Sequence, residues 1–593
     1  MIELYKAEGG RFARWAIGLG MLHLAVLFFL DRTSAGMRES ADIAKLAGFG
    51  YGLAGAIFGF YQSASYARAN HWIWLLHRPL APWRIMAAIA GAGATLLFAA
   101  VLIPLLGFTA GLSLQGGRVV DARHWALPLA GALMGLVGFG IGSYLALAPR
   151  RYGWTALVAV GLLIATSLGT GVAALLLPLL IIAALTLLLM GAFKPDRSLP
   201  PSHPFLLALT AGVAAFGLYF LLLGGVGTVY QLSLAAIGRN PMINTPPSGG
   251  LVEAWRSGSN DLLDAALGAN AGPEAAAIRP NLRSVEAIRL PVALDELPAR
   301  GSLTDPGPVT FTEPRRSIEW TYSHDRNAFV GLRLKDRRAA GELRPADGFE
   351  SPPLLLGDGS MIAGGGLYRL DPRSGALERR LRLPAGEAIV ARPVPVGPAI
   401  AVLSDRALHF VDSSVLESGR ASGARIAVPL PGPVGDLGRL DLARLPDRMI
   451  ISFFFRGDII EGPSKAWQRV VSVAPDGTVS TLAHRSLGPD HSDALRFCAY
   501  WLSPAIRAIA GAAEGIGSGS ARTLRRAPVE VPRGIRIAAG LLSLGAAAAT
   551  ALLAARRRLA AREIAAWTLA ALAFGIPMFG AFWLIRKGPR LTA

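Results

Sequence analysis

Cysteine is almost absent from this chain, whose 593 residues include only Cys498. Internal disulfides are therefore excluded, folded regions must be stabilised by burial, and we expect Cys498 to be a small buried apolar residue. Lysine is also scarce, with six residues, and none of them follows a glycine. The phosphate-binding loop of many nucleotide hydrolases needs a Gly-Lys-Ser/Thr sequence. Any ATPase of that class that serves this protein is therefore expected to be another chain.

Charged residues are missing from four long stretches, residues 46–67, 85–117, 153–193 and 537–555. A helix needs about 20 apolar residues to cross the hydrocarbon core of a membrane. The hydrophobic fraction of 52% and the mean hydropathy of +0.43 are also too high for a soluble protein of this length. The sequence therefore predicts a polytopic α-helical membrane protein.

We predict about nine spans. They are residues 15–30, 46–67, 86–112, 125–148, 154–170, 171–193, 205–232, 537–555 and 564–585. The fifth and sixth share one charge-free stretch, which we divide near Gly169 and Gly171 because glycine permits a tight reversal. Residues 1–14 carry five charged side chains and are expected to lie at the membrane surface before the first span.

The Lys and Arg residues at alternate span ends indicate the orientation. One side carries fourteen and the other carries eight. The fourteen are Lys6, Arg11, Arg14, Arg68, Arg78, Arg84, Arg150, Arg151, Lys194, Arg197, Arg556, Arg557, Arg558 and Arg562. The eight are Arg32, Arg38, Lys45, Arg118, Arg123, Arg586, Lys587 and Arg590. The positive-inside rule places the first side and the N-terminus in the cytoplasm of a bacterial inner membrane, with residues 241–533 in the periplasm. Arg586 and Lys587 oppose this assignment.

The net charge of +19 does not indicate a nucleic-acid partner, because residues 241–533 carry only about +3 of it and the rest lies at span ends. The spans themselves hold no Asp, Glu, Lys or Arg, and His23 is their one ionisable candidate. We expect His23 to be neutral and packed. Ion-coupled transporters usually carry a charged residue near the midplane, so the energy for any transport is expected to come from a partner.

Glycines recur at four-residue spacing in two of the spans. They are Gly48, Gly52, Gly55 and Gly59 in the second span and Gly131, Gly135, Gly138 and Gly142 in the fourth. Such spacing allows helices to approach closely. We expect packing within the chain, with a subunit interface as the alternative.

The loop between the second and third spans, residues 68–84, is not an ordinary polar loop. It has a short apolar face with basic residues beside it and prolines near its end. These residues are Ile73, Leu76, Leu80, Arg78, Arg84, Pro79 and Pro82. Such a segment lies at the membrane surface or docks into a groove of a partner protein.

Residues 75–82, Leu-Leu-His-Arg-Pro-Leu-Ala-Pro, resemble the coupling helix of the type-2 permeases of ABC exporters. That family has an interfacial N-terminal segment and six spans, and the coupling helix between spans two and three docks into an ATPase subunit. The resemblance covers about the first 195 residues and implies a homodimer or paired permease that binds a cytoplasmic ABC ATPase. The implied contact residues are Trp74, Leu75, Leu76, His77, Arg78, Pro79, Leu80, Arg150 and Arg151.

The resemblance and the layout of charged and apolar residues together suggest four regions: a six-span permease-like domain (1–195), a seventh span (196–240), a periplasmic β-rich domain with helical flanks (241–533) and two C-terminal spans (534–593). In the third region, residues 366–383, 407–412 and 470–482 repeat strands with an Asp-containing turn at a spacing of about 40 residues. The unit resembles the repeats of quinoprotein-like propellers, and a β-sandwich is the alternative. A helix over 502–516 is expected to lie on the outer leaflet or to pack against this domain.

We expect the periplasmic domain to bind a substrate or an envelope partner protein, and we expect no cofactor and no catalytic site. Its His and Asp clusters are expected to be exposed loop residues: His324, Asp325, His484, Asp490, His491 and Asp493. The alternatives are a non-transporting membrane scaffold or sensor, or a membrane quinoprotein dehydrogenase. The dehydrogenases need calcium ligands and usually adjacent cysteines, which this sequence does not offer.

Overall fold

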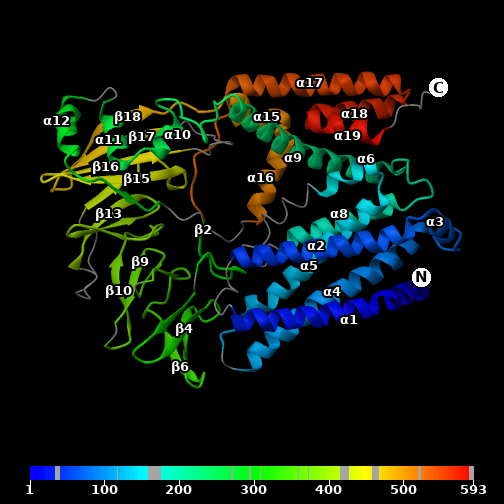
Figure 1. Cartoon of the computed structure of the whole chain (residues 1–593), viewed down its shortest axis with the longest axis horizontal. Helices are drawn as coiled ribbons and strands as arrows, with labels where there is room; N and C mark the ends of the chain where they lie inside the picture. Colours follow the sequence, from blue (N-terminus) through cyan, green and yellow to red (C-terminus); the bar gives the residue numbers. More distant parts are fainter. Residues whose placement is uncertain are drawn as a thin grey trace.

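A computed structural model describes residues 1–33, 41–115, 118–157, 175–268, 272–292, 296–307, 309–357, 359–371, 373–414, 426–456, 466–517 and 522–586. A bundle of long helices forms one side of the molecule and a series of β-sheets forms the other (Figure 1). We call the end of the bundle that carries α3 (Ala69–Leu76) the α3 end, and the end that adjoins the sheets the β end. The chain begins at the α3 end (Figure 1).

Six of the described helices are long and apolar enough to cross a membrane. They are α1 (Ile2–Thr33), α2 (Ala41–Tyr66), α4 (Pro82–Leu114), α5 (Ala122–Leu147), α9 (Pro204–Ala236) and α17 (Arg533–Arg556). Each corresponds to one predicted span, and the spans predicted in α2 and α5 extend one residue beyond the helix. A shorter apolar helix, α8 (Leu176–Ala192), occupies the predicted sixth span, while the predicted fifth span, 154–170, lies mostly outside the described residues. Residues 2–14, which we expect at the membrane surface, are continuous with the first predicted span in helix α1.

Helices α2 and α5 run parallel with their backbones in contact. A Cβ atom added to Gly55 would lie 2.0 Å from the carbonyl oxygen of Gly135, and one added to Gly138 would lie 1.8 Å from that of Gly52. No side chain fits at these distances, so glycine is required for the approach. The prediction that these glycines pack within the chain is confirmed.

His23 is satisfied inside the bundle, as expected. Its Nδ1 lies 3.3 Å from the carbonyl oxygen of Ala100 on α4, and its Nε2 lies 2.9 Å from the hydroxyl of Tyr51 on α2. The carbonyl can only accept, so Nδ1 donates to it, and Nε2 pairs with the Tyr51 hydroxyl. Both ring nitrogens of His23 are therefore in use.

The prediction of one helix over 564–585 is wrong. The segment forms two half-length helices, α18 (Ala561–Phe574) and α19 (Ile576–Ile585), which reverse at Gly575. Gly575 has φ +68°, a left-handed conformation that favours glycine, and Pro577 lies in the first turn of α19. The result is a helical hairpin in the bundle instead of one continuous helix.

Contacts between the two arms show that the hairpin returns to its starting end. The rings of Trp567 and Phe582 lie 5.2 Å apart, and Arg586 Nη2 donates to Glu563 Oε1 at 3.1 Å. Arg586 therefore lies at the α3 end beside Arg557, whose guanidinium donates to its carbonyl oxygen. This placement moves Arg586 to the side that carries the larger number of basic residues, and it removes the conflict that Arg586 posed in the charge count.

The β region contains four antiparallel four-stranded sheets in chain order, which we number I to IV. Sheet I is β3 (Thr310–Glu313), β4 (Ile318–Ser323), β5 (Ala328–Arg333) and β6 (Ala339–Leu343); sheet II is β7 (Leu354–Leu355), β8 (Ser360–Ala363), β9 (Gly366–Leu370) and β10 (Leu377–Arg382). Sheet III is β11 (Val394–Val396), β12 (Ala399–Leu403), β13 (Ala407–Asp412) and β14 (Ile426–Pro429); sheet IV is β15 (Leu437–Arg444), β16 (Met449–Phe455), β17 (Trp467–Val473) and β18 (Val479–Ser486). β1 (Ile288–Leu290) joins sheet IV beside β15, and β2 (Glu296–Leu297) pairs with β19 (Arg522–Thr523).

The predicted repeat corresponds to the third strands of sheets II, III and IV, which are β9, β13 and β17. Each is followed by an aspartate that accepts a hydrogen bond from a main-chain N–H two residues later: Asp371, Asp412 and Asp476. Sheet I has the same arrangement at Asp336 after β5. The sequence repeat missed it because the next turn uses Arg337, at φ +57°, where the turns after β9 and β17 use Gly375 and Gly477.

The sheets pack face to face in an arc (Figure 1). Apolar side chains fill the spaces between sheets I and II, II and III, and III and IV. The outer face of sheet IV is covered by helices α11 (Ser259–Gly268) and α12 (Pro273–Leu282), with α10 (Leu251–Arg256) beside them. The outer face of sheet I carries polar residues such as Glu319 and Thr321. In the described part of the chain, sheets I and IV therefore end an open arc and do not close a ring.

Short helices connect the sheets to the bundle. They are α14 (Asp493–Arg496), α15 (Cys498–Leu502) and α16 (Pro504–Gly517); η2 (Val434–Asp436) lies between β14 and β15, and α6 (Arg150–Gly153) lies at the α3 end. Cys498 is buried, as expected, in the same core as Leu502 and Ile506. Helix α16 packs into that core on one side and lies across the direction of the long helices (Figure 1).

Candidate functional site

The predicted docking segment forms helix α3 and the turn after it. Trp72 and Leu75 point into the core of the bundle, and Leu75 is 0% exposed. Ile73 and Trp74 point outward, and Trp74 is 57% exposed. Two apolar residues thus anchor the helix while two others remain available at its surface.

The other predicted contact residues divide in the same way. His77, Pro79 and Arg150 are exposed, while Leu76, Arg78, Leu80 and Arg151 are half-buried. The Arg78 guanidinium lies 4.0 Å from the centre of the Trp74 ring. The surface that a partner could reach therefore centres on Trp74 and Arg78, whereas Leu75 is a packing residue of this chain.

Arg197 connects several segments at the α3 end. Sequence reasoning missed this role because it used Arg197 only as one of the basic residues that indicate the orientation in the membrane. Its guanidinium donates to the carbonyl oxygen of Ala67, after α2, and to those of Ala146 and Leu147 at the end of α5. It also lies 5.2 Å from the ring centre of Trp72. Carbonyls at helix ends lack intrahelical donors, so one side chain caps two parallel helices and contacts α3.

The segment around Arg197 also joins α3 to α6. The rings of Trp72 and Phe193 lie 4.8 Å apart, and Arg151 Nη2 donates to the Ser198 carbonyl oxygen at 3.2 Å. Burial lowers the pKa of Lys194 to about 8, against the opposing effect of Asp196. Because the contacts of Trp72 and Arg151 connect α3 to α6, the two predicted docking segments, residues 74–80 and 150–151, lie at the same end of the bundle.

The α3 end is basic and aromatic at its surface. Neither residues 66–84 nor residues 146–157 include an Asp or Glu, and Arg68, Arg84 and Arg150 are exposed there. The exposed rings of Trp74 and Trp83 lie among these charges. Such a surface suits either an acidic protein groove or anionic lipid headgroups.

One carboxylate is buried near this end. Glu8 on α1 accepts hydrogen bonds from Gln62 Nε2 at 3.0 Å and from the hydroxyl of Tyr66, both on α2, and Arg11 Nη1 lies 3.8 Å away. Glu8 belongs to residues 1–14, which the sequence predicts to lie at the membrane surface. Instead it fastens α1 to α2, because the helix begins earlier than the hydropathy pattern indicated.

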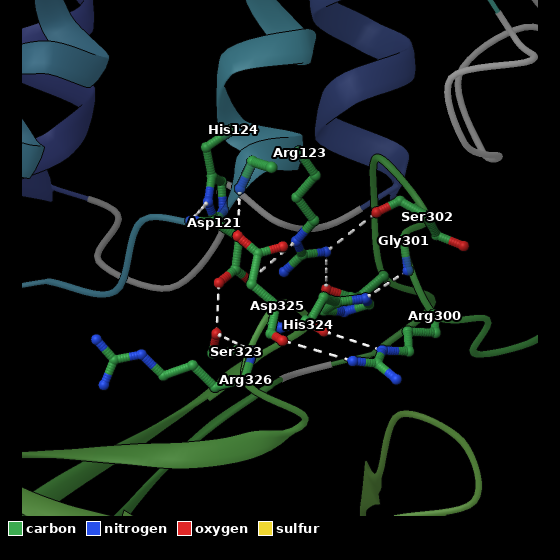
Figure 2. Close-up of polar contacts among 12 residues, drawn as sticks. Asp121, Arg123, His124, Arg300, Gly301, Ser302, Ser323, His324, Asp325 and Arg326 are labelled. Carbon is green, nitrogen blue, oxygen red and sulfur yellow. Dashed lines mark hydrogen bonds and ion pairs between the residues drawn. The ribbon is translucent and has the colours of Figure 1, made fainter.

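At the β end, a buried polar cluster fastens α5 to sheet I (Figure 2). We call it the joint; it consists of Asp121, Arg123, Asp305, Ser323 and His324, each at most 5% exposed. Asp121 accepts from Ser323 Oγ at 2.5 Å and from the His324 main-chain N–H at 2.8 Å. Both donors lie at the end of β4, so the start of α5 is bonded directly to the sheet.

Arg123 and His324 both pair with Asp305. Arg123 Nη1 lies 2.5 Å from Asp305 Oδ2, and His324 Nε2 lies 3.1 Å from Asp305 Oδ1. The Gly301 N–H donates to His324 Nδ1 at 3.0 Å, so Nε2 carries the ring proton and donates it to Asp305. Burial favours a raised pKa for Asp305, but the hydrogen bond from His324 and the Arg123 charge outweigh it, and the pKa is lowered.

The joint corrects one expectation about the histidines. His324 was expected in an exposed loop, yet it is 3% exposed. His491 is buried too and lies 3.4 Å from Gln231 of α9, while His484 is exposed. Burial raises the pKa of Asp490, which accepts from the Val252 N–H at 2.7 Å. These buried groups connect the sheets to the bundle, and their hydrogen-bond partners come from elements far away in the sequence.

Comparisons with known proteins name no family. No family model and no curated protein matches the chain. Hydrazine synthase from Kuenenia stuttgartiensis is 12% identical with a TM-score of 0.18, over 29% of this chain and 53% of that one. The S. cerevisiae core factor is 12% identical with a TM-score of 0.15, over 31% of this chain and 42% of that one. The chain thus spans about half the length of the structures it matches, and likenesses this weak carry no argument about fold or function.

Proposed function

We propose that the chain is the transmembrane subunit of an ABC-type export complex that a separate cytoplasmic ATPase energises. In this proposal the ATPase docks on the surface formed by Trp74, His77, Arg78, Pro79 and Arg150. The sheets lie on the opposite side of the membrane and bind the substrate or an envelope partner. A homodimer or a pair of related permeases would place two such docking surfaces side by side.

The observation that supports this proposal most is the construction of the α3 end. A docking element that transmits force must be exposed on one side and fixed on the other. Helix α3 exposes Trp74 while Trp72 and Leu75 are buried, and Arg197 connects it to the ends of α2 and α5. A helix that only rested on the membrane surface would not need this attachment to two spans.

The decisive experiment compares two exposed tryptophans at opposite ends of the bundle. Trp74→Ala removes the centre of the proposed docking surface, and Trp125→Ala removes a 43%-exposed ring at the start of α5. Buried interface tryptophans typically contribute 2 kcal/mol or more to binding, which is roughly thirtyfold in affinity. We expect an ATP-hydrolysing subunit to copurify in mild detergent with the wild type and with Trp125→Ala, and to be largely lost from Trp74→Ala.

Both variants should keep the melting temperature of the wild type, because neither ring is in the core. Equal copurification and equal ATP hydrolysis for the two variants would refute docking through α3. The absence of any ATPase in the wild-type preparation would refute the export proposal itself.

The joint supports one alternative, a non-transporting scaffold or sensor. Its buried contacts between Asp121, Arg123 and Asp305 fasten the sheets to the bundle without flexible linkage. A sensor that reports binding at the sheets across the membrane also needs such a connection. This alternative predicts a partner at the α3 end that does not hydrolyse ATP.

A further inference from the structure

A groove runs along α17 at the β end of the bundle, and we propose that it holds an anionic lipid of the adjoining leaflet. The groove has a volume of about 1180 Å³. Its walls come from the first half of α17, the preceding residues 529–532, Tyr500 of α15, Pro504 at the start of α16, and the tip of α18. The inference goes beyond the export proposal and does not depend on an ATPase.

The hairpin formed by α18 and α19 explains why the groove exists. Gly575, at the tip, is so close to α17 that an added Cβ atom would lie 3.4 Å from Ser543 Oγ. Helix α17 continues for ten residues from Ser543 back to its start at Arg533. The hairpin therefore leaves this part of α17 uncovered, and Leu572 and Ala573 of its tip form the floor of the groove.

The depth of the groove fits one leaflet. Arg533 and Leu544 both line it and are eleven residues apart on α17, which is about 16 Å at 1.5 Å per residue. That is about half of the roughly 30 Å hydrocarbon core. The lower walls are apolar, with Ile535, Ala539 and Leu572 among them. An acyl chain of a single leaflet matches this length and chemistry.

The mouth of the groove is cationic. Arg533 and Arg536 line it together with Glu530, which leaves one net positive charge, and both arginines are exposed. Guanidinium groups bind phosphate through paired hydrogen bonds, and basic residues at the interface attract anionic lipids. Because the cations lie above an apolar channel, the arrangement matches a phosphate headgroup with its acyl chain below.

Entry from the membrane is open. Ile537 and Leu541, on the adjoining face of α17, are 53% and 64% exposed. The volume also exceeds the roughly 300–1,000 Å³ of typical small-molecule pockets. A lipid can therefore reach the groove sideways from the bilayer, whereas a free polar anion would find apolar walls below the arginines.

The test measures lipid binding to the full-length protein in mild detergent by native mass spectrometry. The probes are palmitoyl-oleoyl phosphatidylglycerol, the phosphatidylcholine with the same chains, and glycerol phosphate as the free headgroup. We expect phosphatidylglycerol to bind at least tenfold more tightly than phosphatidylcholine, and millimolar glycerol phosphate not to displace it. The Arg533→Gln/Arg536→Gln protein should lose roughly tenfold to thirtyfold in affinity for phosphatidylglycerol.

A second pair of variants tests the channel. Gly540 lines the groove, Gly545 does not, and an added Cβ atom meets nothing within 4 Å at either position. Gly540→Leu should block binding of phosphatidylglycerol, while Gly545→Leu should leave it unchanged. Arg556→Gln, at the other end of α17, controls for the loss of a positive charge.

Two results would overturn the proposal. Equal affinities for the two lipids, unchanged in the double arginine variant, would show that no anionic headgroup is selected. Displacement of the lipid by glycerol phosphate, with Gly540→Leu behaving like wild type, would show a polar anion site without an acyl channel. The exposed arginine substitutions keep the test valid even if a leucine variant fails to fold.

Discussion

The two ends of α5 are held by different chemistry. At the β end, Asp121 and Arg123 bond to side chains and main-chain groups of sheet I, and all of the joint is buried. At the α3 end, the carbonyls of Ala146 and Leu147 bond to one guanidinium, that of Arg197, close to residues that remain exposed. The first arrangement is suited to permanent attachment. The second attaches the inner face of α3 to the bundle and leaves its outer face exposed, which is suited to a partner that binds reversibly.

The largest expected effect comes from removing the cation of the joint. Arg123→Ala would leave Asp305 and Asp121 buried without their positive neighbour, and breaking a buried ion pair in this way costs about 3–5 kcal/mol. We expect a clear loss of thermal stability in detergent and fast hydrogen exchange in residues 300–305 and 323–326.

The control for this change, Arg326, lies in the turn after β4, beside Ser323 and His324 of the joint. Arg326 pairs with Glu342 at 3.0 Å, and both side chains are well exposed. Arg326→Ala should therefore cost at most about 1 kcal/mol. Similar losses in the two variants would mean that the joint does not attach the sheets to the bundle.

A smaller effect is expected at the α3 end. Arg197→Lys keeps the charge but loses the planar fork that reaches the carbonyls of both α2 and α5. We expect a cost of roughly 1.5–3 kcal/mol, because one or two charged hydrogen bonds are lost. Hydrogen exchange should rise in residues 67–77 and stay unchanged at the joint. Arg84→Lys, an exposed substitution at the same end, should change neither; a rise there as large as in Arg197→Lys would contradict the role of Arg197.

The smallest effect on stability, and the sharpest on orientation, comes from single cysteines. Ser248→Cys lies in the exposed segment after α9 and Arg556→Cys at the exposed end of α17, while Cys498 is buried and adds little background. In intact spheroplasts we expect an impermeant thiol reagent to label the first and not the second. A cysteine at position 587 should be protected like the one at 556, because the hairpin returns Arg586 to the α3 end. Labelling at 587 without labelling at 556 would mean that the segment crosses the membrane.

Local chemistry in the sequence accounts for much of the fold. The predicted spans, none of which holds an Asp, Glu, Lys or Arg, located the six long helices, because the hydrocarbon core excludes charge over a fixed length. Glycine spacing predicted the close contact of α2 and α5, and the Asp-containing turns located the third strands of three sheets. The break at Gly575 was missed although Gly-Ile-Pro is a helix stop followed by a start, because the apolar run around it has the length of one span.

The site residues were less predictable because their partners are distant in the chain. Asp305 lies 182 residues after Arg123, and Arg197 lies 130 residues after Ala67. Each of these charges looks like an ordinary loop charge by itself. The proposed docking segment could be predicted because its apolar and basic residues are contiguous. Which of its side chains point inward depends on Phe193 and Arg197, which no local pattern connects to Trp72.

The glycine contact between α2 and α5 has a mechanical consequence. Where two helices meet through side chains, rotamer changes let one slide over the other; here main chain rests on main chain, so no deformable layer separates them. We therefore expect the two helices to move as one rigid unit about 39 Å long, the length of the 26 residues of α5. At the α3 end, Arg197 donates hydrogen bonds to the ends of both helices. At the β end, Asp121 accepts a hydrogen bond from sheet I. A displacement of α3 would therefore be transmitted to the sheets as a rigid-body movement of α2 and α5, with little internal deformation of the pair.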